Sequence, residues 1–517
     1  MLQATPLPKG GGFASLPVTA LAAWAATALA VAAFALHAAV SNNYDFYRDE
    51  LYFIVCGQHP ALGYVDQPPL IPLLAAASQL FGESRVAIHL IAALGGPAAV
   101  LVACATVRLL RGGFWAELLA GLAAGFAPIY LALSSTLSTS TFEPLVWGWT
   151  AYFLMRAALA DDRKALVYAG IVAGVALEAK YGILFYVAGL LVGLLLTPQR
   201  KLLFSREVAS ALAIAAALAA PNFFWQWWHG FPILPVLLNN VDHLDLVLSP
   251  TAFFANQALM MNPLLAPVWL AGVVAPFADA RFRPLRFLSV AFVTVFVAML
   301  ALHAKSYYLS PAYIAAFAVG AVALDRWVGS LRLRYAYLGL AFVSSAILAP
   351  LPIPMLAPQQ YLTYEHALGF HDAPVETRPQ SQIPQLFADM TGWHDLARSV
   401  AVAYDKLDPQ DRARATIFTY NYGEASAIDL FGGPLGLPKA LSGHNNFYLW
   451  GPGKADGGVV LLVGSKLRGL ARECRKSSVV GTFGAPFALP EEHGEIVLCR
   501  DLGSTFRAAW TRLRHYD

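Results

Sequence analysis

Charged residues are scarce in this chain of 517 residues: they make up 13% of it, against about a quarter in ordinary soluble proteins. Hydrophobic residues make up 58%, and the mean hydropathy is +0.55. This composition excludes an ordinary soluble protein. The net charge of +3 is small, and no run of basic residues interleaved with aromatic ones is present, which excludes the usual nucleic-acid-binding classes.

A glycine-rich nucleotide loop and an internal repeat are also missing. The one glycine run, Gly10–Gly12, precedes the first apolar segment instead of joining a strand to a helix, so no nucleotide-binding fold is indicated. The lack of a repeat counts against inverted-repeat transporter folds. A polytopic transporter of an envelope lipid or glycan precursor remains the alternative function, and an uptake assay would separate it from an enzyme.

Long apolar runs recur along the first two thirds of the chain. A helix needs roughly 20 residues to cross a hydrocarbon core of about 30 Å. We therefore predict about eleven spans, near residues 17–40, 86–107, 114–133, 142–160, 165–180, 182–197, 207–228, 253–275, 287–304, 307–324 and 335–352. The fifth and sixth are short and share the break EAKYGILF, so a single re-entrant hairpin is an alternative. We expect the first to be a retained anchor, because its apolar core is longer than that of a secretory signal.

Lysine and arginine mark the orientation of these spans. With the N-terminus inside, one set of loops receives most of them: Arg108, Arg111, Arg156, Arg163, Lys164, Arg200, Lys201, Arg206, Arg281, Arg283, Arg286, Arg326, Arg332 and Arg334. The opposite set holds only Arg48, Arg85, Lys180 and Lys305. By the positive-inside rule, the first outer loop (41–85) and everything after Pro352 lie outside the cytoplasmic membrane. We expect a bacterial inner-membrane protein with a periplasmic C-terminal domain.

The tail after Pro352 has a different character. Charged residues become common, and four short β-type runs appear: ATIFTY, GGVVLLVG, SSVVGTFG and GEIVLC. Between the first two, NYGEASAIDLFG is typical of a turn that leads into a helix. This order predicts two domains, a membrane domain at 1–352 and an extracytoplasmic α/β domain at 353–517. Cys474 and Cys499 both fall in the second, where a disulfide between them is plausible in an oxidising compartment.

Charge that is rare elsewhere is crowded into the first outer loop, NNYDFYRDELYFIVCGQHPALGYVDQPPL. Anchoring at the membrane interface explains Tyr44 and Tyr47, but it does not explain Asp49 and Glu50 in a segment that can form a helix. Adjacent helical residues point about 100° apart. We therefore expect one carboxylate to face a site and the other to pair with Arg48 or cap a neighbour. Downstream, two prolines follow Asp66 and Gln67 and present these polar groups at a rigid bend.

Four stretches together resemble the bacterial members of glycosyltransferase family 39, the relatives of protein O-mannosyltransferases and of the lipid A aminoarabinose transferase. They are YRDELYFIVCGQHPALGYVDQPPL, LEAKYGILFY, HAKSYYLSPAYIAAFAVGAV and NYGEASAIDLFGGPLGLPKALSGHNNFYLWGP. The resemblance implies a GT-C type α-helical membrane glycosyltransferase that uses a polyprenyl-phosphate-linked sugar and inverts the anomeric carbon. In the family the aspartate of the first outer loop is the proposed catalytic base.

That motif matches Asp49 here, with Glu50 as the neighbouring acid. The aminoarabinose transferase has an acid–lysine–proline stretch where this chain has Asp66, Gln67 and Pro68, so the lysine is missing. The resemblance leaves the sugar open, and the acceptor as well: lipid A, a protein, another envelope glycan or a glycolipid.

The reaction requires a base for the acceptor hydroxyl and a cation for the departing phosphate. The outward-side cations Lys180, Lys305 and Arg85, with Tyr181 and Tyr308 beside the lysines, are the candidates for binding the donor phosphate. Lys180 interrupts an apolar hairpin, where a lysine is equally able to extend its ammonium to the interface without binding a ligand. Lys305 is equally compatible with an interfacial belt.

Two further groups are candidates for positions near the substrate. Asp242, His243 and Asp245 occupy a loop without lysine or arginine; with Asp66 they offer ligands for a divalent metal, but the spacing fits no metal motif, and a solvated loop is the favoured interpretation. In the tail, SGHNNFYLWGP gathers His444, Asn445 and Asn446 in a loop that offers hydrogen bonds and stacking to a sugar. A packing role for its aromatic residues is at least as well supported. No other cofactor is predicted.

Overall fold

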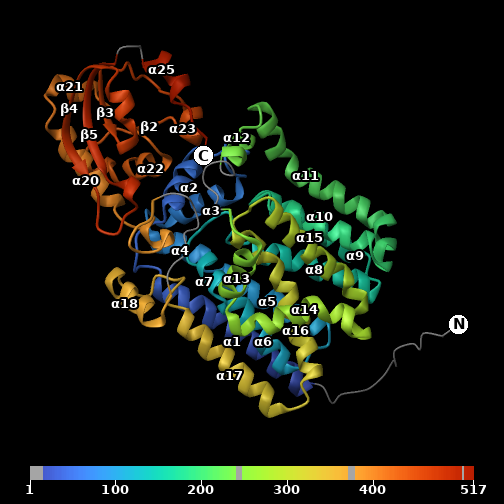
Figure 1. Cartoon of the computed structure of the whole chain (residues 1–517). Helices are drawn as coiled ribbons and strands as arrows, with labels where there is room; N and C mark the ends of the chain where they lie inside the picture. The colour runs from blue at the N-terminus through green and yellow to red at the C-terminus, as the bar shows by residue number, and fades with distance from the viewer. Residues whose placement is uncertain (1–15, 240–246, 371–378, 503–505, 517) are drawn as a thin grey trace.

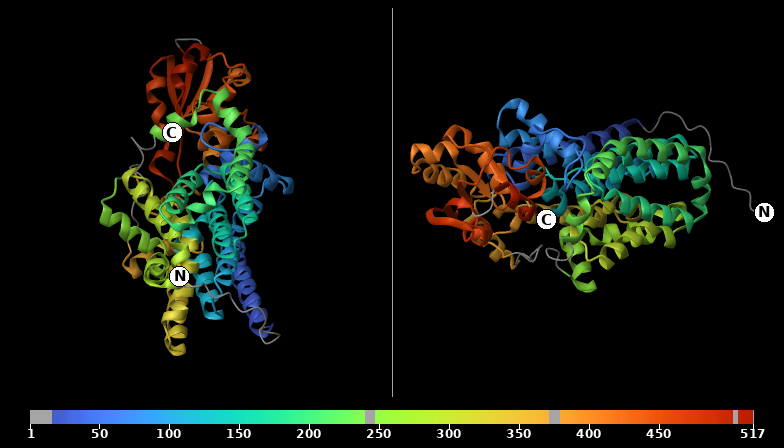
Figure 2. Two further views of the ribbon diagram at one scale, coloured as in Figure 1. Left: turned by 90° about the vertical axis from the view of Figure 1, so that its right-hand side faces the viewer. Right: turned by 90° about the horizontal axis from the view of Figure 1, so that it is seen from above.

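The computed structural model describes residues 16–239, 247–370, 379–502 and 506–516 (Figure 1). Helices from the first two thirds of the chain form an elongated bundle, and an α/β unit built from residues 393–502 and 506–516 lies at one end of it (Figure 2). The predicted combination of a helical body with a small C-terminal α/β unit is therefore present.

Every predicted span coincides with a helix or with a pair of helices. The bundle helices are α1 (Leu16–Val40), α5 (Gly95–Leu109), α6 (Phe114–Phe126), α7 (Pro128–Leu133), α8 (Glu143–Ala160), α9 (Lys164–Leu177), α10 (Ile183–Leu195), α11 (Arg206–Trp228), α12 (Ile233–Asn239), α13 (Pro250–Met260), α14 (Ala266–Ala278), α15 (Arg286–Ala301), α16 (Tyr313–Trp327) and α17 (Leu331–Leu348). Among the described residues, six helical segments are long and apolar enough to cross a membrane, or up to eight if each bent pair is one span. The chain is thus a multi-pass membrane protein. The number eleven stays a prediction, because shorter apolar helices such as α6 and α9 fall below that length.

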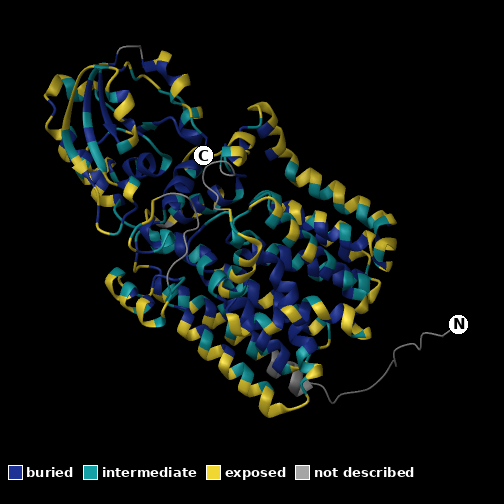
Figure 3. Ribbon diagram, in the orientation of Figure 1, coloured by how far each residue is buried: buried dark blue, intermediate teal, exposed yellow. Residues whose placement is uncertain are grey.

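The bundle is organised around α16. In the apolar segment that contains α16, 83% of the residues are buried, whereas in the segments of α11 and α17 the share is 6% and 17%. The exposed faces of α11 and α17 are visible in Figure 3. Glycines allow α14 and α16 to approach closely: a Cβ on Gly320 would lie 1.8 Å from the carbonyl oxygen of Val268, and one on Gly272 would lie 1.9 Å from that of Ala316. Such close backbone contact is typical of helix pairs in membranes.

The first outer loop folds into short helices that pack against the α/β unit. These helices are α2 (Arg48–Gln58), α3 (Leu70–Ser78), η1 (Gln79–Phe81) and α4 (Arg85–Ala92). Every residue of α2 from Leu51 to Cys56 is buried, because the helix shares one hydrophobic core with Trp393, Ile428 and Phe447 of the α/β unit. Burial of this apolar helix on several sides explains why its sequence, LYFIVC, shows no polar face.

The α/β unit contains a five-stranded sheet in the order β2-β1-β3-β5-β4. Its strands are β1 (Thr416–Thr419), β2 (Ala440–Ser442), β3 (Val459–Val463), β4 (Cys474–Phe483) and β5 (Gly494–Leu502). β1, β2 and β3 are parallel, and β5 pairs antiparallel with both β3 and β4. The four predicted strands are β1, β3, β4 and β5; β2, with only three residues, was not predicted.

Helices cover both faces of this sheet. On the face toward the first outer loop lie α20 (Trp393–Asp405) and α22 (Tyr422–Phe431), and on the other face α25 (Phe506–Leu513) packs on Phe418 and Leu462. The remaining helices of the tail are α18 (Pro358–Leu368), α19 (Gln385–Ala388), α21 (Pro409–Arg414), α23 (Asn445–Trp450) and α24 (Arg468–Ala471). Because both faces are covered, β3 is buried along its whole length, as expected for the central strand of such a sheet.

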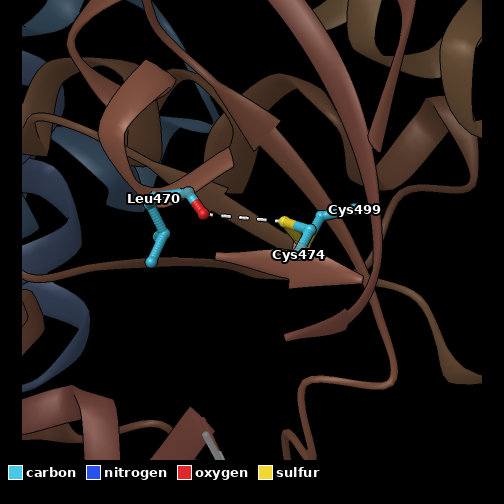
Figure 4. The surroundings of a disulfide bond; sticks show 3 residues. All are labelled: Leu470, Cys474 and Cys499. Carbon is cyan, nitrogen blue, oxygen red and sulfur yellow. Dashed lines mark hydrogen bonds between the residues drawn. A yellow bond between two sulfur atoms is a disulfide. The ribbon is translucent and has the colours of Figure 1, made fainter. Parts of the chain in front are cut away.

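A disulfide joins Cys474 of β4 to Cys499 of β5, with 5.5 Å between their Cα atoms (Figure 4). The predicted pairing is therefore present. It links neighbouring antiparallel strands, in which Cys499 lies opposite Ser477. Cys56 and Cys104 are buried and free.

Candidate active site

Asp49 and Glu50 occupy the first turn of α2 and point in different directions, as their helical spacing predicts. The side chain of Asp49 is 29% exposed and lines a cavity of about 500 Å³ between the bundle and the tail. Glu50 is fully buried. Its carboxylate accepts hydrogen bonds from the backbone N–H groups of Tyr47 (2.9 Å) and Leu137 (2.7 Å).

Glu50 also lies 3.1 Å from Nε2 of His89, which is buried as well. Glu50 therefore caps α2 and fastens it to the loop after α7, and the described contacts keep it out of the cavity.

The interpretation of Tyr44 and Tyr47 as interface anchors needs correction. Tyr44 is buried, and its hydroxyl donates to the carbonyl oxygen of Leu356, while Tyr47 lines the cavity with Asp49.

Arg48 forms an ion pair with Asp49. Its side chain is almost fully buried and lies 3.8 Å from Asp49, 3.5 Å from Asp389 and 3.3 Å from Glu491. The last two carboxylates belong to the tail. The guanidinium therefore joins the start of α2 to the tail in a buried ion-pair network, in which removal of the arginine would be costly.

The cavity gathers residues from distant parts of the chain. One wall is apolar and includes Ile129, Leu133, Leu259, Met260 and Leu351. The polar side chains that line it are Tyr47, Asp49, Thr136, Ser138, Thr139, Ser140, Asn256, Lys305, Ser306, Tyr307, Tyr361, Glu365 and Gln385. An amphipathic cavity of this kind suits a ligand with a lipid tail and a polar head.

Of the predicted phosphate-binding cations, Lys305 is the one that lines this cavity in the described part of the chain. Lys180 lies behind the wall: its ammonium donates to Oγ of Ser140 (2.6 Å) and pairs with Glu143 (3.3 Å). Arg85 contacts Asn42 (2.8 Å) and Asp45 (3.9 Å) and is not among the cavity residues.

The two tyrosines predicted to bind the donor phosphate, Tyr181 and Tyr308, are not among the residues that line the cavity. The ring of Tyr308 lies 4.2 Å from the ammonium of Lys180, so Tyr308 belongs to the support of the cavity wall. Tyr181 donates its hydroxyl to Asn222 of α11 (2.5 Å) and lies outside the cavity lining.

The run from Thr136 to Ser140 was not predicted from the sequence to be part of the site. It follows α7, and its side chains at 136, 138, 139 and 140 line the cavity. The run is fixed from behind by Glu50 at Leu137 and by Lys180 at Ser140. Its sequence, TLSTS, is the available signal: five residues with four hydroxyl groups between two apolar helices.

Asp66 lies in a polar cluster where the α/β unit meets the first outer loop. Its carboxylate accepts hydrogen bonds from the hydroxyl of Tyr52 (3.1 Å) and from the side-chain amide of Asn445 (3.3 Å). Burial raises the pKa of Asp66 to about 6, and the negative charge of Asp49 acts in the same direction, while the Tyr52 hydrogen bond and His444 oppose the shift. Gln67 is buried beside it.

The loop with His444, Asn445 and Asn446 docks on this cluster. All three are buried, and the side-chain oxygen of Asn446 accepts a hydrogen bond from the backbone N–H of Val65 (2.7 Å) and lies 3.2 Å from the hydroxyl of Tyr52. The structure thus brings these residues to Asp66, but in a packed interface instead of an open sugar-binding surface.

The loop with Asp242, His243 and Asp245, for which a solvated loop was favoured over a metal site, lies outside the described residues. Within residues 16–239, 247–370, 379–502 and 506–516, no group of three or more His, Cys, Asp or Glu side chains is arranged to hold a metal ion.

Comparison with known proteins gives a consistent family of matches. A family profile for dolichyl-phosphate-mannose-protein mannosyltransferases matches residues 66–225. The lipid A galacturonosyltransferase RgtD of Rhizobium johnstonii is 28% identical over 358 residues, which cover 66% of this chain and 74% of RgtD.

Solved structures of ArnT from Cupriavidus metallidurans have a similar fold. The structure bound to undecaprenyl phosphate superposes with a TM-score of 0.57 at 14% identity, covering 94% of this chain and 98% of ArnT. The apo structure gives 0.57 at 17% identity, covering 93% and 98%. The resemblance inferred from the four sequence stretches is confirmed by these matches together.

Proposed function

We propose that the chain, a GT-C type membrane glycosyltransferase, moves a sugar from a polyprenyl-phosphate-linked donor to a hydroxyl group of a lipid A-type glycolipid on the periplasmic face of the bacterial inner membrane. One observation carries the proposal: Asp49 and Lys305, a carboxylate and an ammonium separated by more than 250 residues in sequence, line the same cavity. They supply the two functions that the reaction needs.

Asp49 is the general base in this proposal. It is partly exposed to the cavity, unlike the fully buried Glu50, so an acceptor hydroxyl has access to its carboxylate. A positioned carboxylate that removes a proton as the new bond forms typically contributes a factor of about 10²–10⁴ in rate.

Lys305 is the proposed partner of the donor phosphate. Its side chain is at the cavity surface beside Ser306 and Tyr307, where a compact ammonium can neutralise the charge that develops on the leaving group. Lys180 has an indirect role, because it braces Ser140 and Glu143 behind the cavity wall. The hydroxyl-rich run from Thr136 to Ser140 then faces the sugar and offers hydrogen bonds to its hydroxyl groups.

The step is a single displacement. The acceptor oxygen forms a bond to the anomeric carbon, its proton passes to Asp49, and the bond from that carbon to the phosphate oxygen breaks. The polyprenyl phosphate leaves as an anion next to Lys305. Attack from the face opposite the phosphate inverts the anomeric carbon, and holding both partners in line supplies much of the rate acceleration.

The nature of the two substrates is supported by the relatives and by the cavity. RgtD is a lipid A galacturonosyltransferase, and one ArnT structure contains undecaprenyl phosphate. The apolar wall with Ile129, Leu133 and Leu259 suits the first isoprenoid units of such a lipid. Charge asymmetry of the loops supports a periplasmic site, with a membrane domain at 1–352 and a periplasmic domain at 353–517.

Lipid analysis of a strain that lacks this gene tests the proposal. Mass spectrometry of lipid A and of the other envelope glycolipids should show the loss of one sugar residue, whose mass identifies the transferred sugar. A plasmid copy of the wild-type gene should restore it. Unchanged lipid A with a change in glycosylated protein would refute the acceptor, and unchanged envelope glycans of every class would refute the function.

A further inference from the structure

Tyr422 of the α/β unit reaches across to the first outer loop and contacts Asp49 directly. Its phenolic hydroxyl donates a hydrogen bond of 2.7 Å to Oδ1 of Asp49, although the two residues are 373 positions apart. Burial, reinforced by the charge of Asp49, raises the pKa of Tyr422 well above its ordinary value. The phenol therefore stays protonated and remains the donor in this bond.

The start of α22 fixes the position of Tyr422. The side chains of Asn421 and Glu424 form a reciprocal capping box: Asn421 accepts from the N–H of Glu424 (2.8 Å), and Glu424 accepts from the N–H of Asn421 (3.1 Å). Such a box fixes the first turn of a helix. Tyr422 is the first helical residue, and its N–H donates to Nδ1 of His444 (3.2 Å).

The ring is held as firmly as the backbone. It stacks on Tyr52 of α2 with 4.6 Å between ring centroids, and the guanidinium of Arg48 lies 5.8 Å from its centroid. These contacts leave the hydroxyl little freedom except toward Asp49. One oxygen of the carboxylate is thus occupied by a rigid donor, which fixes the plane of the carboxylate and leaves the second oxygen for the cavity.

We propose that Tyr422 is a positioning residue of the transferase: its hydroxyl orients the carboxylate of Asp49 toward the acceptor hydroxyl, so that the α/β unit completes the active site. The inference rests on the proposed function, in which Asp49 is the base. It gives the α/β unit a role in positioning the catalytic base, in addition to its packing against α2.

The test is Tyr422→Phe in the full-length protein, assayed in detergent with a synthetic undecaprenyl-phosphate sugar and lipid A. Removal of a hydrogen bond to a charged group is expected to lower kcat by about tenfold to a hundredfold. The KM for the donor should stay unchanged. Tyr404→Phe is the matched control. Its hydroxyl donates to the carbonyl oxygen of Arg412 within the same unit (2.9 Å), away from the cavity, so its kcat should stay within about twofold of wild type.

The double variant Asp49→Asn with Tyr422→Phe distinguishes positioning from a general structural effect. If Tyr422 acts through Asp49, the double variant should be no slower than Asp49→Asn alone, because residues that act as a unit are not additive. A fully multiplicative loss would overturn the proposal, and so would a Tyr422→Phe kcat equal to that of Tyr404→Phe. Near-normal turnover of Asp49→Asn would instead refute the proposed base, which is a separate failure.

Discussion

Replacement of Lys180 by alanine should damage the protein in a different way from replacement of Lys305. The ammonium of Lys180 pairs with Glu143 at 3.3 Å and donates to Ser140 at 2.6 Å, and the side chains of Lys180 and Glu143 are only 20% and 6% exposed. Lys180→Ala leaves the Glu143 carboxylate buried without its partner. Loss of one member of a buried pair costs about 3–5 kcal/mol, which is a large part of the stability of a typical protein.

The expected result for Lys180→Ala is therefore a lower melting temperature in detergent and less protein in the membrane. The double variant Lys180→Met with Glu143→Gln should recover much of the stability, because it removes both charges together. Lys305→Ala, at the cavity surface, should raise the KM for the donor and lower kcat.

Donor titrations and thermal melts on the same purified samples measure both effects. The reasoning would be refuted if Lys180→Ala melted like the wild type and showed a selective rise in the donor KM. That outcome would favour direct binding of the phosphate by Lys180, as the break in the apolar hairpin first suggested.

Three other predictions follow from contacts outside the membrane spans. Reduction of the Cys474–Cys499 disulfide, whose cysteines are 25 residues apart in the sequence, should destabilise the α/β unit by about 3 kcal/mol. Alkylation of intact cells with and without reductant also reports whether the unit is periplasmic. Labelling of both thiols without reductant would contradict the disulfide. Burial raises the pKa of Asp66 to about 6, so its contribution to stability is complete below about pH 4 and is lost as the pH rises to about 6, a change on the order of 2–3 kcal/mol. Urea melts of Asp66→Asn should lack this pH dependence, and a variant whose stability varies with pH as the wild type does would contradict the prediction. Glu50→Ala should lower the amount of folded protein, since the backbone N–H of Leu137 loses its partner, whereas normal levels with lost turnover would point to a catalytic Glu50.

Much of the secondary structure was predictable from the sequence, because hydropathy and alternation report local burial. The apolar runs became helices and four β-type runs became β1, β3, β4 and β5. β2 was missed because three residues, Ala440–Ser442, carry no periodicity. The place of Asp49 at the cavity was expected from the acidic motif and the resemblance, and the 100° spacing of adjacent residues predicted that only one of Asp49 and Glu50 would face the site.

The partners of these residues were not predictable in the same way. Nothing near Lys180 in the sequence indicates that its ammonium meets Glu143 at the start of α8. The run Thr136–Ser140 has the composition of an ordinary polar loop, and its place at the cavity depends on contacts with Glu50 and Lys180. Likewise, Asn446 meets Val65 across 381 residues. Such contacts are set by tertiary packing, which a single sequence does not display.

Turnover by Asp49→Asn tests the central claim most directly. The substitution keeps the shape of the side chain and an oxygen acceptor for Tyr422, but it removes the basicity of the carboxylate. With purified protein, a synthetic undecaprenyl-phosphate sugar and lipid A, kcat should fall by about 10²–10⁴, while the melting temperature and the KM for the donor stay close to those of the wild type. Turnover within a few-fold of the wild type, at equal protein in the membrane, would contradict the assignment of Asp49 as the base.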